Sequence, residues 1–156
     1  MRVKIVALGR LKTGAERALV EDYGARFDKL GKGMGLGPLE IVELDDRKGG
    51  GKAGEADLIL RALSNDTFAI ALDERGDQIG SPEFASLLAH SRDDGQNTIS
   101  FVIGGADGLH KSVLDRSQRS LSFGKMVWPH MLARVLLCEQ LYRATTILAG
   151  TPYHRA

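Results

Sequence analysis

The chain of 156 residues lacks several features that would assign it to a class at once. It has a single cysteine, Cys138, which excludes an intrachain disulfide, and its four histidines are scattered, with no pair at the spacing of metal ligands. No apolar run approaches the length of a membrane span, and the first residues lack the pattern of a secretory signal. We therefore expect a cytoplasmic protein without a metal site.

The chain also lacks a strong excess of one charge. It has 21 Lys and Arg against 20 Asp and Glu, for a formal net charge of +1. Nucleic-acid-binding domains usually carry a larger basic excess, so composition alone does not indicate RNA as a partner. A basic loop with Arg47, Lys48 and Lys52 is typical of exposed surface, although such a loop could touch a phosphate backbone.

Two common phosphate-binding motifs are absent. Gly51-Lys52 is not part of a P-loop, because Asp46 stands where the first glycine belongs and Ala53 replaces the magnesium-binding Ser or Thr. The first predicted strand-to-helix turn, residues 9–14, has no G-x-G-x-x-G pattern. Its absence argues against a nicotinamide-dependent oxidoreductase, one alternative class for such a chain.

Hydrophobic periodicity predicts alternating strands and helices. The expected strands are 2–8, 39–44, 67–72, 98–103 and 121–123; the expected helices are 14–30, 55–63, 81–90, 110–119 and 129–148. We expect Ser81 to be the N-cap of the third helix, a turn at 73–76 to close the third strand, and Gly150 to end the last helix. The pattern predicts one domain, 1–156, with an α/β fold: a mostly parallel sheet with helices on both faces.

The last predicted helix is apolar around much of its circumference. Such a helix must be buried on more than one side, either by its own sheet or by another subunit. Cys138 lies within this apolar run, so we interpret it as a core residue and not as a nucleophile.

An apolar run ending in glycines, residues 101–109, is the strongest candidate for a ligand site. It is typical of a strand, a glycine turn and a helix, an arrangement that exposes backbone N–H groups, although the same glycines can serve packing alone. In parallel sheets, ligands bind at the carboxyl ends of strands. Leu72 with Asp73, Gly104–Gly108 and the residues after Leu121 are therefore expected to form three walls of one crevice, where Asp73 and Glu74 either orient a ribose or only close the turn.

Five short motifs in order, spread over the whole chain, resemble the RlmH family, the large-subunit ribosomal RNA pseudouridine N3-methyltransferases of the SPOUT class. The motifs are Leu72-Asp73-Glu74-Arg75-Gly76, Phe101-Val102-Ile103-Gly104-Gly105 with Gly108-Leu109, Pro129-His130 with Arg134-Val135, Glu139-Gln140-Leu141-Tyr142-Arg143-Ala144, and Pro152-Tyr153-His154-Arg155.

The resemblance implies several properties that periodicity does not reveal. The C-terminal part would form the α/β knot of SPOUT proteins, a deep trefoil knot. The protein would be a homodimer, packed through its knot helices, that methylates a pseudouridine of 23S ribosomal RNA in the assembled ribosome. The cofactor would be S-adenosylmethionine, held by Leu72, Gly104 and the segment Phe123, Gly124, Lys125, Met126, Val127 and Trp128.

Methyl transfer to a ring nitrogen requires alignment, exclusion of water and removal of the N3 proton, and it needs no metal. Our hypothesis is that His154 or a neighbouring group accepts or relays this proton, that Arg155 and Arg143 stabilise charge on the base or bind phosphates, and that Tyr153 stacks on the base. The alternative is that this tail docks on a partner subunit for stability alone.

The last helix offers further candidates. His130 and Arg134, one turn apart, could contact RNA or the cofactor carboxylate; alternatively, His130 caps the helix and Arg134 forms an ion pair at a dimer interface. Glu139 and Arg143 are expected to form an ion pair with each other. A noncatalytic RNA-binding or ribosome-assembly module is the second alternative function.

Overall fold

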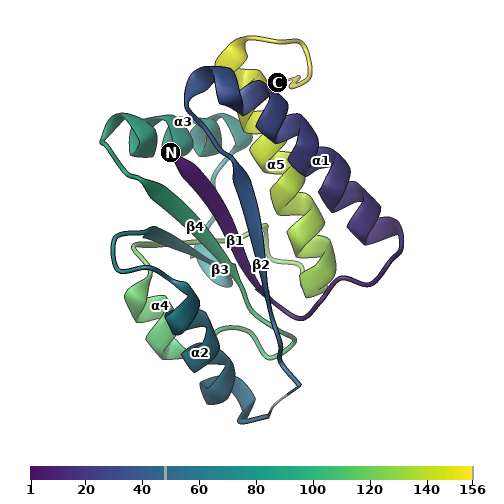
Figure 1. Cartoon of the computed structure of the whole chain (residues 1–156), viewed down its shortest axis with the longest axis vertical. Helices are drawn as coiled ribbons and strands as arrows, with labels where there is room; N and C mark the ends of the chain where they lie inside the picture. Colours follow the sequence, from purple (N-terminus) through teal and green to yellow (C-terminus); the bar gives the residue numbers. More distant parts are fainter. Residues whose placement is uncertain (48, 156) are drawn as a thin grey trace.

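The computed structural model describes residues 1–47 and 49–155, which form an α/β fold around one parallel sheet (Figure 1). Its five strands run in the order β2-β1-β4-β3-β5. Every pairing between them is parallel, as expected from strands separated by helices. The strands are β1 (Arg2–Leu8), β2 (Leu39–Leu44), β3 (Phe68–Asp77), β4 (Thr98–Ile103) and β5 (Arg119–Leu121).

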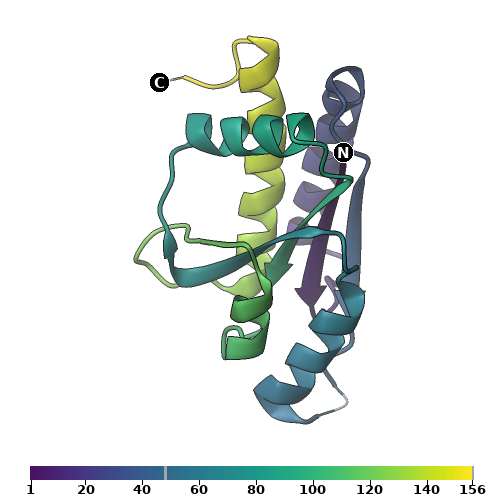
Figure 2. The ribbon, with the colours of Figure 1, turned by 90° about the vertical axis from the view of Figure 1, so that its left-hand side faces the viewer.

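Helices cover both faces of the sheet, which confirms the predicted architecture (Figures 1 and 2). Helices α1, α3 and α5 pack on one face, and α2 and α4 cover the other. The trefoil knot implied by the resemblance stays a prediction. The helices are α1 (Ala15–Gly31), the short 3₁₀ helix η1 (Lys32–Met34), α2 (Gly51–Ala62), α3 (Ser81–Asp93), α4 (Lys111–Arg116) and α5 (His130–Ala149).

The central strands are buried on both faces, which explains their almost continuous apolar sequence. In β1, Val3 and Ile5 point into the core beneath α1, α3 and α5, whereas Val6 and Leu8 point into the core beneath α2 and α4. No helix among the described residues is long and apolar enough to span a membrane.

Helix α5 contributes a large share of the first core and ends as predicted at Gly150, which adopts a left-handed conformation. Cys138 is completely buried in this helix, so its assignment to the core is confirmed. Burial raises the pKa of its thiol to about 12, which leaves it protonated and a poor nucleophile at neutral pH.

Several predicted boundaries were wrong, among them the end of α3, which continues to Asp93. Helix α2 begins at Gly51, four residues before the predicted start, because Gly49–Gly51 all adopt positive φ and turn the chain directly into the helix. Helix α4 ends at Arg116 and is shorter than the apolar pattern predicted. Strand β5 ends at Leu121 and lies earlier in the chain than predicted.

The expected N-cap at Ser81 was also wrong. Gly80 occupies the cap position, and the Ser81 hydroxyl instead donates to Oε1 of Gln140 on α5 at 2.7 Å. A tertiary hydrogen bond therefore replaces the local one that the sequence suggested.

The expected turn at 73–76 is instead part of β3, which continues to Asp77. The register against β5 breaks here, because Leu72 and Asp77 both pair with Leu121. A Cβ on Gly76 would lie 2.7 Å from backbone atoms of Leu121, so only glycine lets the two backbones approach this closely. This irregular stretch forms one side of the site described next.

Candidate cofactor site

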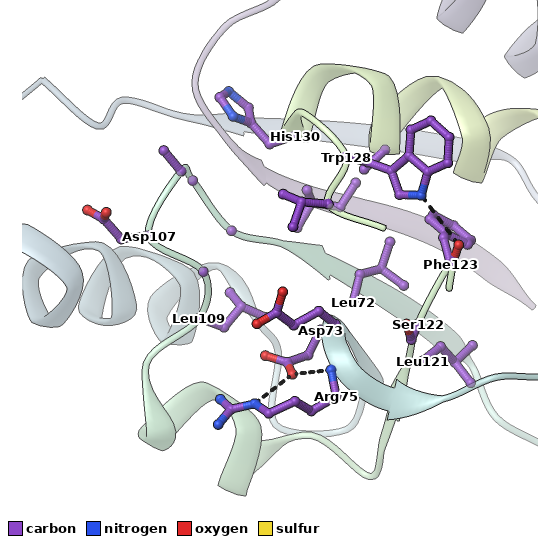
Figure 3. A pocket seen from close by; sticks show the side chains of 18 of the residues that line it. Leu72, Asp73, Arg75, Asp107, Leu109, Leu121, Ser122, Phe123, Trp128 and His130 are labelled. Carbon is purple, nitrogen blue, oxygen red and sulfur yellow. Dashed lines mark hydrogen bonds and ion pairs between the residues drawn. The ribbon is translucent and has the colours of Figure 1, made fainter. Parts of the chain in front are cut away.

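A cavity of about 430 Å³ lies at the carboxyl edge of the sheet. The end of β3, the glycine loop after β4 and the segment after β5 surround it (Figure 3). The structure therefore brings together the three segments predicted to form one crevice. Its volume falls within the usual range for sites that bind small molecules, roughly 300–1,000 Å³.

Apolar side chains form much of the cavity wall. Leu72 lies between Leu109 of the glycine loop and Phe123 and Trp128 of the segment after β5 (Figure 3). The Trp128 indole donates to the backbone carbonyl of Phe123 at 3.4 Å, which closes this segment on itself. A flat, apolar ligand group fits between such walls.

The segment 121–128 also offers exposed apolar groups. Met126 and Val127 line the cavity, yet their residues remain 74% and 82% exposed. Gly124 lines it as well, whereas Lys125 is not among the lining residues. Large apolar side chains exposed in this way are typical of a surface that a ligand or another subunit covers.

Backbone groups of the same segment are available to a ligand. Within the described part of the chain, the N–H groups of Met126, Val127 and Trp128 donate to no protein acceptor. They stand beside the apolar walls, so the site can bind a ring and the polar atoms on its edge at the same time. This combination fits the adenine of S-adenosylmethionine.

The glycine loop is tightly packed and also lines the cavity. A Cβ on Gly104 would lie 2.9 Å from the carbonyl oxygen of Gly108 and from Cδ2 of Leu109, so close packing requires this glycine. Gly104 and Gly108 nevertheless line the cavity. Packing alone explains the glycine, and its position makes the loop a wall of the site.

The carboxylates of Asp73, Glu74 and Asp107 line the cavity together with the basic side chains of Lys52 and Arg75. Burial raises the pKa of Glu55 on α2, and the nearby carboxylates of Asp107 and Asp46 raise it further, against the opposing influence of His130 and Lys52. Asp73 lines the cavity and pairs with Arg75 at 3.5 Å. These carboxylates can interact with a cationic group of a ligand, such as a sulfonium.

Arg134 does not reach this cavity or the surface, so both roles considered for it were wrong. It is completely buried and pairs with Glu43 of β2 at 2.8 Å, and it donates to the carbonyl oxygen of Gly9 at 3.1 Å. Glu43 also accepts from the backbone N–H of Leu11 at 2.6 Å. Arg134 is thus a structural link between α5 and the carboxyl ends of β1 and β2.

His130 does line the cavity, at the first turn of α5. It makes no capping hydrogen bond, because Pro129 is the N-cap and no side chain caps this helix. The imidazole Nε2 lies close to Gly9, where Asp46 also approaches. His130 therefore lies at the cavity, and its contact with RNA or the cofactor carboxylate stays a prediction.

The four predicted catalytic residues lie away from the cavity. Arg143 and the tail residues Tyr153, His154 and Arg155 gather at the C-terminal end of α5 (Figures 1 and 2). The 20 residues of α5 span about 30 Å, and His130 marks the other end. The chain therefore does not bring its own tail to its own cavity.

The tail is nevertheless ordered against α5. Arg143 and Glu139 form the expected ion pair at 2.6 Å, and the Tyr153 hydroxyl donates to the same Glu139 oxygen at 3.0 Å. Burial raises the pKa of Tyr153 to about 12, with the hydrogen bond to Glu139 as a second cause. The phenol is therefore protonated at neutral pH and remains a donor.

The basic loop contributes less than its sequence suggested. Arg47 pairs with Asp45 at 2.9 Å, and Lys48 lies outside the described residues. Lys52 lines the cavity. Only Lys52 can therefore be placed at the site.

A second groove of about 450 Å³ adjoins the cavity, and the sequence did not indicate it. It lies between the start of α3, the middle of α5 and the segment 121–124, and it shares Phe123 and Trp128 with the cavity. Ile79, Phe84 and Leu136 give it an apolar lining. Residues far apart in the sequence meet here, so no local pattern could have revealed the groove.

Within the described ranges, no group of three or more His, Cys, Asp or Glu side chains is arranged to hold a metal ion.

Comparisons with known proteins agree with this architecture. A family model described as "Predicted SPOUT methyltransferase" matches residues 1–154. The protein named "Ribosomal RNA large subunit methyltransferase H" from Dinoroseobacter shibae is 57% identical over 155 residues, or 99% of each chain, and its namesake from Ruegeria pomeroyi is 54% identical over the same share. The crystal structure of a probable methyltransferase from Bordetella pertussis superimposes with a TM-score of 0.54 at 17% identity, covering 92% of this chain and 94% of that one; it supports the fold alone.

Proposed function

Because the chain belongs to the SPOUT methyltransferase family, we propose that it transfers a methyl group from S-adenosylmethionine to N3 of a pseudouridine in 23S ribosomal RNA. The observation that carries the proposal is the cavity at the carboxyl edge of the sheet, where apolar walls, free backbone N–H groups and carboxylates stand together. Full-length relatives named as large-subunit ribosomal RNA methyltransferases support the choice of substrate. The place of action would be the assembled ribosome in the cytoplasm.

Different residues around the cavity would bind different parts of the cofactor. Leu72 and Trp128 would enclose the adenine, the N–H groups of 126–128 would bind its edge, and Gly104 would form part of the backbone wall beside the ligand. S-adenosylmethionine supplies a methyl group that is already activated by its sulfonium. Asp73 and Asp107 would complement that positive charge.

The site would be completed by a second copy of the chain. The tail and the cavity lie at opposite ends of α5, so a tail that acts on the substrate must reach the cavity of a partner. Leu132 and Trp128 are exposed apolar residues on α5 and the segment before it, and the second groove adjoins them. We propose that a homodimer covers this surface and places the partner's tail beside the cofactor.

Substrate recognition would depend on a preformed particle. The net charge of +1 provides little general attraction for phosphates, so binding to isolated RNA should be weak and sensitive to salt. Lys52 at the cavity and the exposed Arg155 of the tail would supply local phosphate or base contacts.

Calorimetry and mass spectrometry test the proposal. Titration with S-adenosylmethionine should show binding, whereas nicotinamide dinucleotide should not bind. Ribosomal RNA from cells that lack the protein should miss a single methyl group on a pseudouridine. An unchanged RNA would contradict the enzymatic function; no binding of either cofactor would favour the noncatalytic RNA-binding alternative.

A further inference from the structure

The carboxylate of Glu139 connects the C-terminal tail to α5. Its Oε1 accepts from Nε and Nη2 of Arg143 at 2.9 and 2.6 Å and from the hydroxyl of Tyr153 at 3.0 Å. The Arg143 guanidinium also lies 4.8 Å from the centre of the Tyr153 ring. Glu139 thus fixes both the arginine and the tyrosine in one orientation.

While Nε and Nη2 of Arg143 bind Glu139, its Nη1 lies 3.2 Å from Nδ1 of His154. A guanidinium has five N–H donors and no acceptor, so the imidazole Nδ1 must be the acceptor. An acceptor nitrogen carries no proton. The neutral ring must then carry its proton on Nε2, and that N–H points away from the arginine.

We propose that Arg143, oriented by Glu139, holds His154 as the neutral Nε2–H tautomer, so that His154 acts on the substrate as a hydrogen-bond donor and not as a proton acceptor. The inference rests on the proposed methyl transfer and sharpens it. It replaces the role of proton acceptor that the sequence suggested for His154. Glu139 and Arg143 become positioning residues, which act through the histidine.

The donor role follows from the balance of the reaction. Removal of the N3 proton leaves a negative charge that spreads onto the adjacent carbonyl oxygens of the base. In this assignment a water molecule takes the N3 proton, and the Nε2–H of His154 donates to a carbonyl oxygen as the charge develops. The N3 lone pair then forms the bond to the methyl carbon, and the carbon–sulfur bond breaks with its electron pair on sulfur.

The positioning network extends beyond the tail. Gln140 donates from Nε2 to the second oxygen of Glu139 at 2.9 Å, and Ser81 donates to Oε1 of Gln140 at 2.7 Å. Both Gln140 and Ser81 line the second groove. The carboxylate that orients the tail is therefore anchored in the surface proposed to bind the partner chain.

Nitrogen NMR on the full-length protein tests the tautomer directly. With ¹⁵N-labelled histidine, and His154→Gln to assign the signal, His154 at neutral pH should show a protonated Nε2 and an unprotonated Nδ1. In Arg143→Gln this preference should weaken, and both nitrogens should move toward the averaged shifts of a free imidazole. A wild-type signal from Nδ1–H or from an imidazolium would overturn the proposal.

Single-turnover kinetics on ribosomes that lack the methyl group test the role of the donor. A glutamine amide places an N–H donor near the position of Nε2 but cannot serve as a base. We expect His154→Gln to stay within about tenfold of the wild-type rate, whereas His154→Ala loses about 10²-fold or more. Equal losses in the two variants would overturn the donor role. His90→Gln, an exposed histidine on α3, is the matched control and should be fully active.

The positioning role of Glu139 has its own readout. Glu139→Ala should lower the rate of methyl transfer and loosen the His154 tautomer, with little change in the dissociation constant of S-adenosylmethionine. Glu139→Gln keeps an acceptor for Arg143 and Tyr153. It should recover part of the rate of methyl transfer and part of the tautomer preference of His154. An unchanged tautomer in Glu139→Ala would overturn this part of the proposal.

The outcomes separate this inference from the proposed function. The wild type could bind S-adenosylmethionine and methylate ribosomes while His154 shows an Nδ1–H or an imidazolium signal. In that case only the donor role fails. If the tautomer is as expected but no methylation occurs, the proposed function fails and the geometry of the tail stands.

Discussion

At the scale of single residues, the most consequential side chains are charged groups with little contact with water. Arg134 and Glu43 are separated by 91 positions, yet they form the ion pair that joins α5 to the sheet. Nε of Arg134 has no partner within the described structure, so the burial of this guanidinium is only partly compensated. The pair fixes the place where α5 begins, next to the cavity.

Replacement of Arg134 should therefore be costly. Arg134→Ala leaves a cavity and removes the partner of Glu43, and we expect a loss of about 3–5 kcal/mol in the free energy of unfolding. Urea denaturation measures this loss. The double variant Arg134→Met with Glu43→Leu should recover much of it, because no charge is then left unpaired. A single-variant cost below about 1 kcal/mol would contradict the structural role.

Glu55 carries a prediction for pH. Its pKa is raised, chiefly by burial, so the folded state disfavours the charged carboxylate. At neutral pH the charged carboxylate therefore lowers the free energy of unfolding. This loss disappears as the pH falls below 4.5, the ordinary pKa of the group. Glu55→Gln should stabilise the protein at neutral pH by up to about 1 kcal/mol, with the gain vanishing in acid.

Thermal melts over this pH range measure the difference. Glu16→Gln, in the first turn of α1, is a suitable control because it removes a carboxylate that favours the helix dipole and should lower the melting temperature slightly. A lower melting temperature for Glu55→Gln at neutral pH would show that its carboxylate is stabilising after all.

At the scale of elements, the contact between β3 and β5 shapes the cavity. The two strands pair around Leu121 on both sides of an irregular stretch, and Gly76 allows their backbones to touch. The same stretch carries Asp73, Glu74 and Arg75 into the cavity wall. The position of these side chains thus depends on a contact between strands.

Gly76→Ala should disrupt this contact. The new methyl group would lie 2.7 Å from the backbone of Leu121, so the strands must separate. We expect a loss of about 1–3 kcal/mol in stability and weaker binding of S-adenosylmethionine, measured by urea denaturation and calorimetry. Gly33→Ala, which meets nothing within 4 Å, should leave both unchanged. Wild-type affinity in Gly76→Ala would disprove the link between this contact and the site.

At the scale of the whole molecule, the position of the tail ties its proposed role in the chemistry to the proposed dimer. One chain holds the proposed cofactor site at the start of α5 and the proposed reactive groups beyond its end. A tail that merely stabilised the partner would be dispensable for chemistry. Mixed dimers distinguish these two cases.

We expect deletion of residues 153–156 to abolish methylation while S-adenosylmethionine binding and dimerisation persist. Leu72→Arg, which places a charge in the apolar wall of the cavity, should abolish cofactor binding but keep the tail. Mixed dimers of the two chains should recover activity, because one partner supplies an intact cavity and the other an intact tail. Methylation assays on purified mixed dimers test this, and full activity of the deletion variant would remove the tail from the chemistry.

The sequence alone predicted much of the fold because strands and helices leave local periodic patterns. Strands 2–8, 39–44 and 98–103 were confirmed with their exact bounds, and α1 and α5 were confirmed within one residue. The errors occurred where a residue that fits a local sequence rule instead contacts a partner far away in the sequence. Ser81 bonds to Gln140 instead of capping α3, and residues 73–76 pair beside β5 instead of turning.

The candidate site divides in the same way. The rule that ligands bind at the carboxyl ends of parallel strands predicted that Leu72, Gly104 and the segment after Leu121 would meet, and they do. The sequence by itself thus determined most of the sheet and its helices and the edge of the sheet at which the cavity lies. Only the tertiary structure decided that Arg134 is buried, that Glu139 and His154 both contact Arg143, and that the tail lies away from its own cavity. These three features depend on distances between residues that are far apart in the sequence. A local sequence pattern contains no information about such distances.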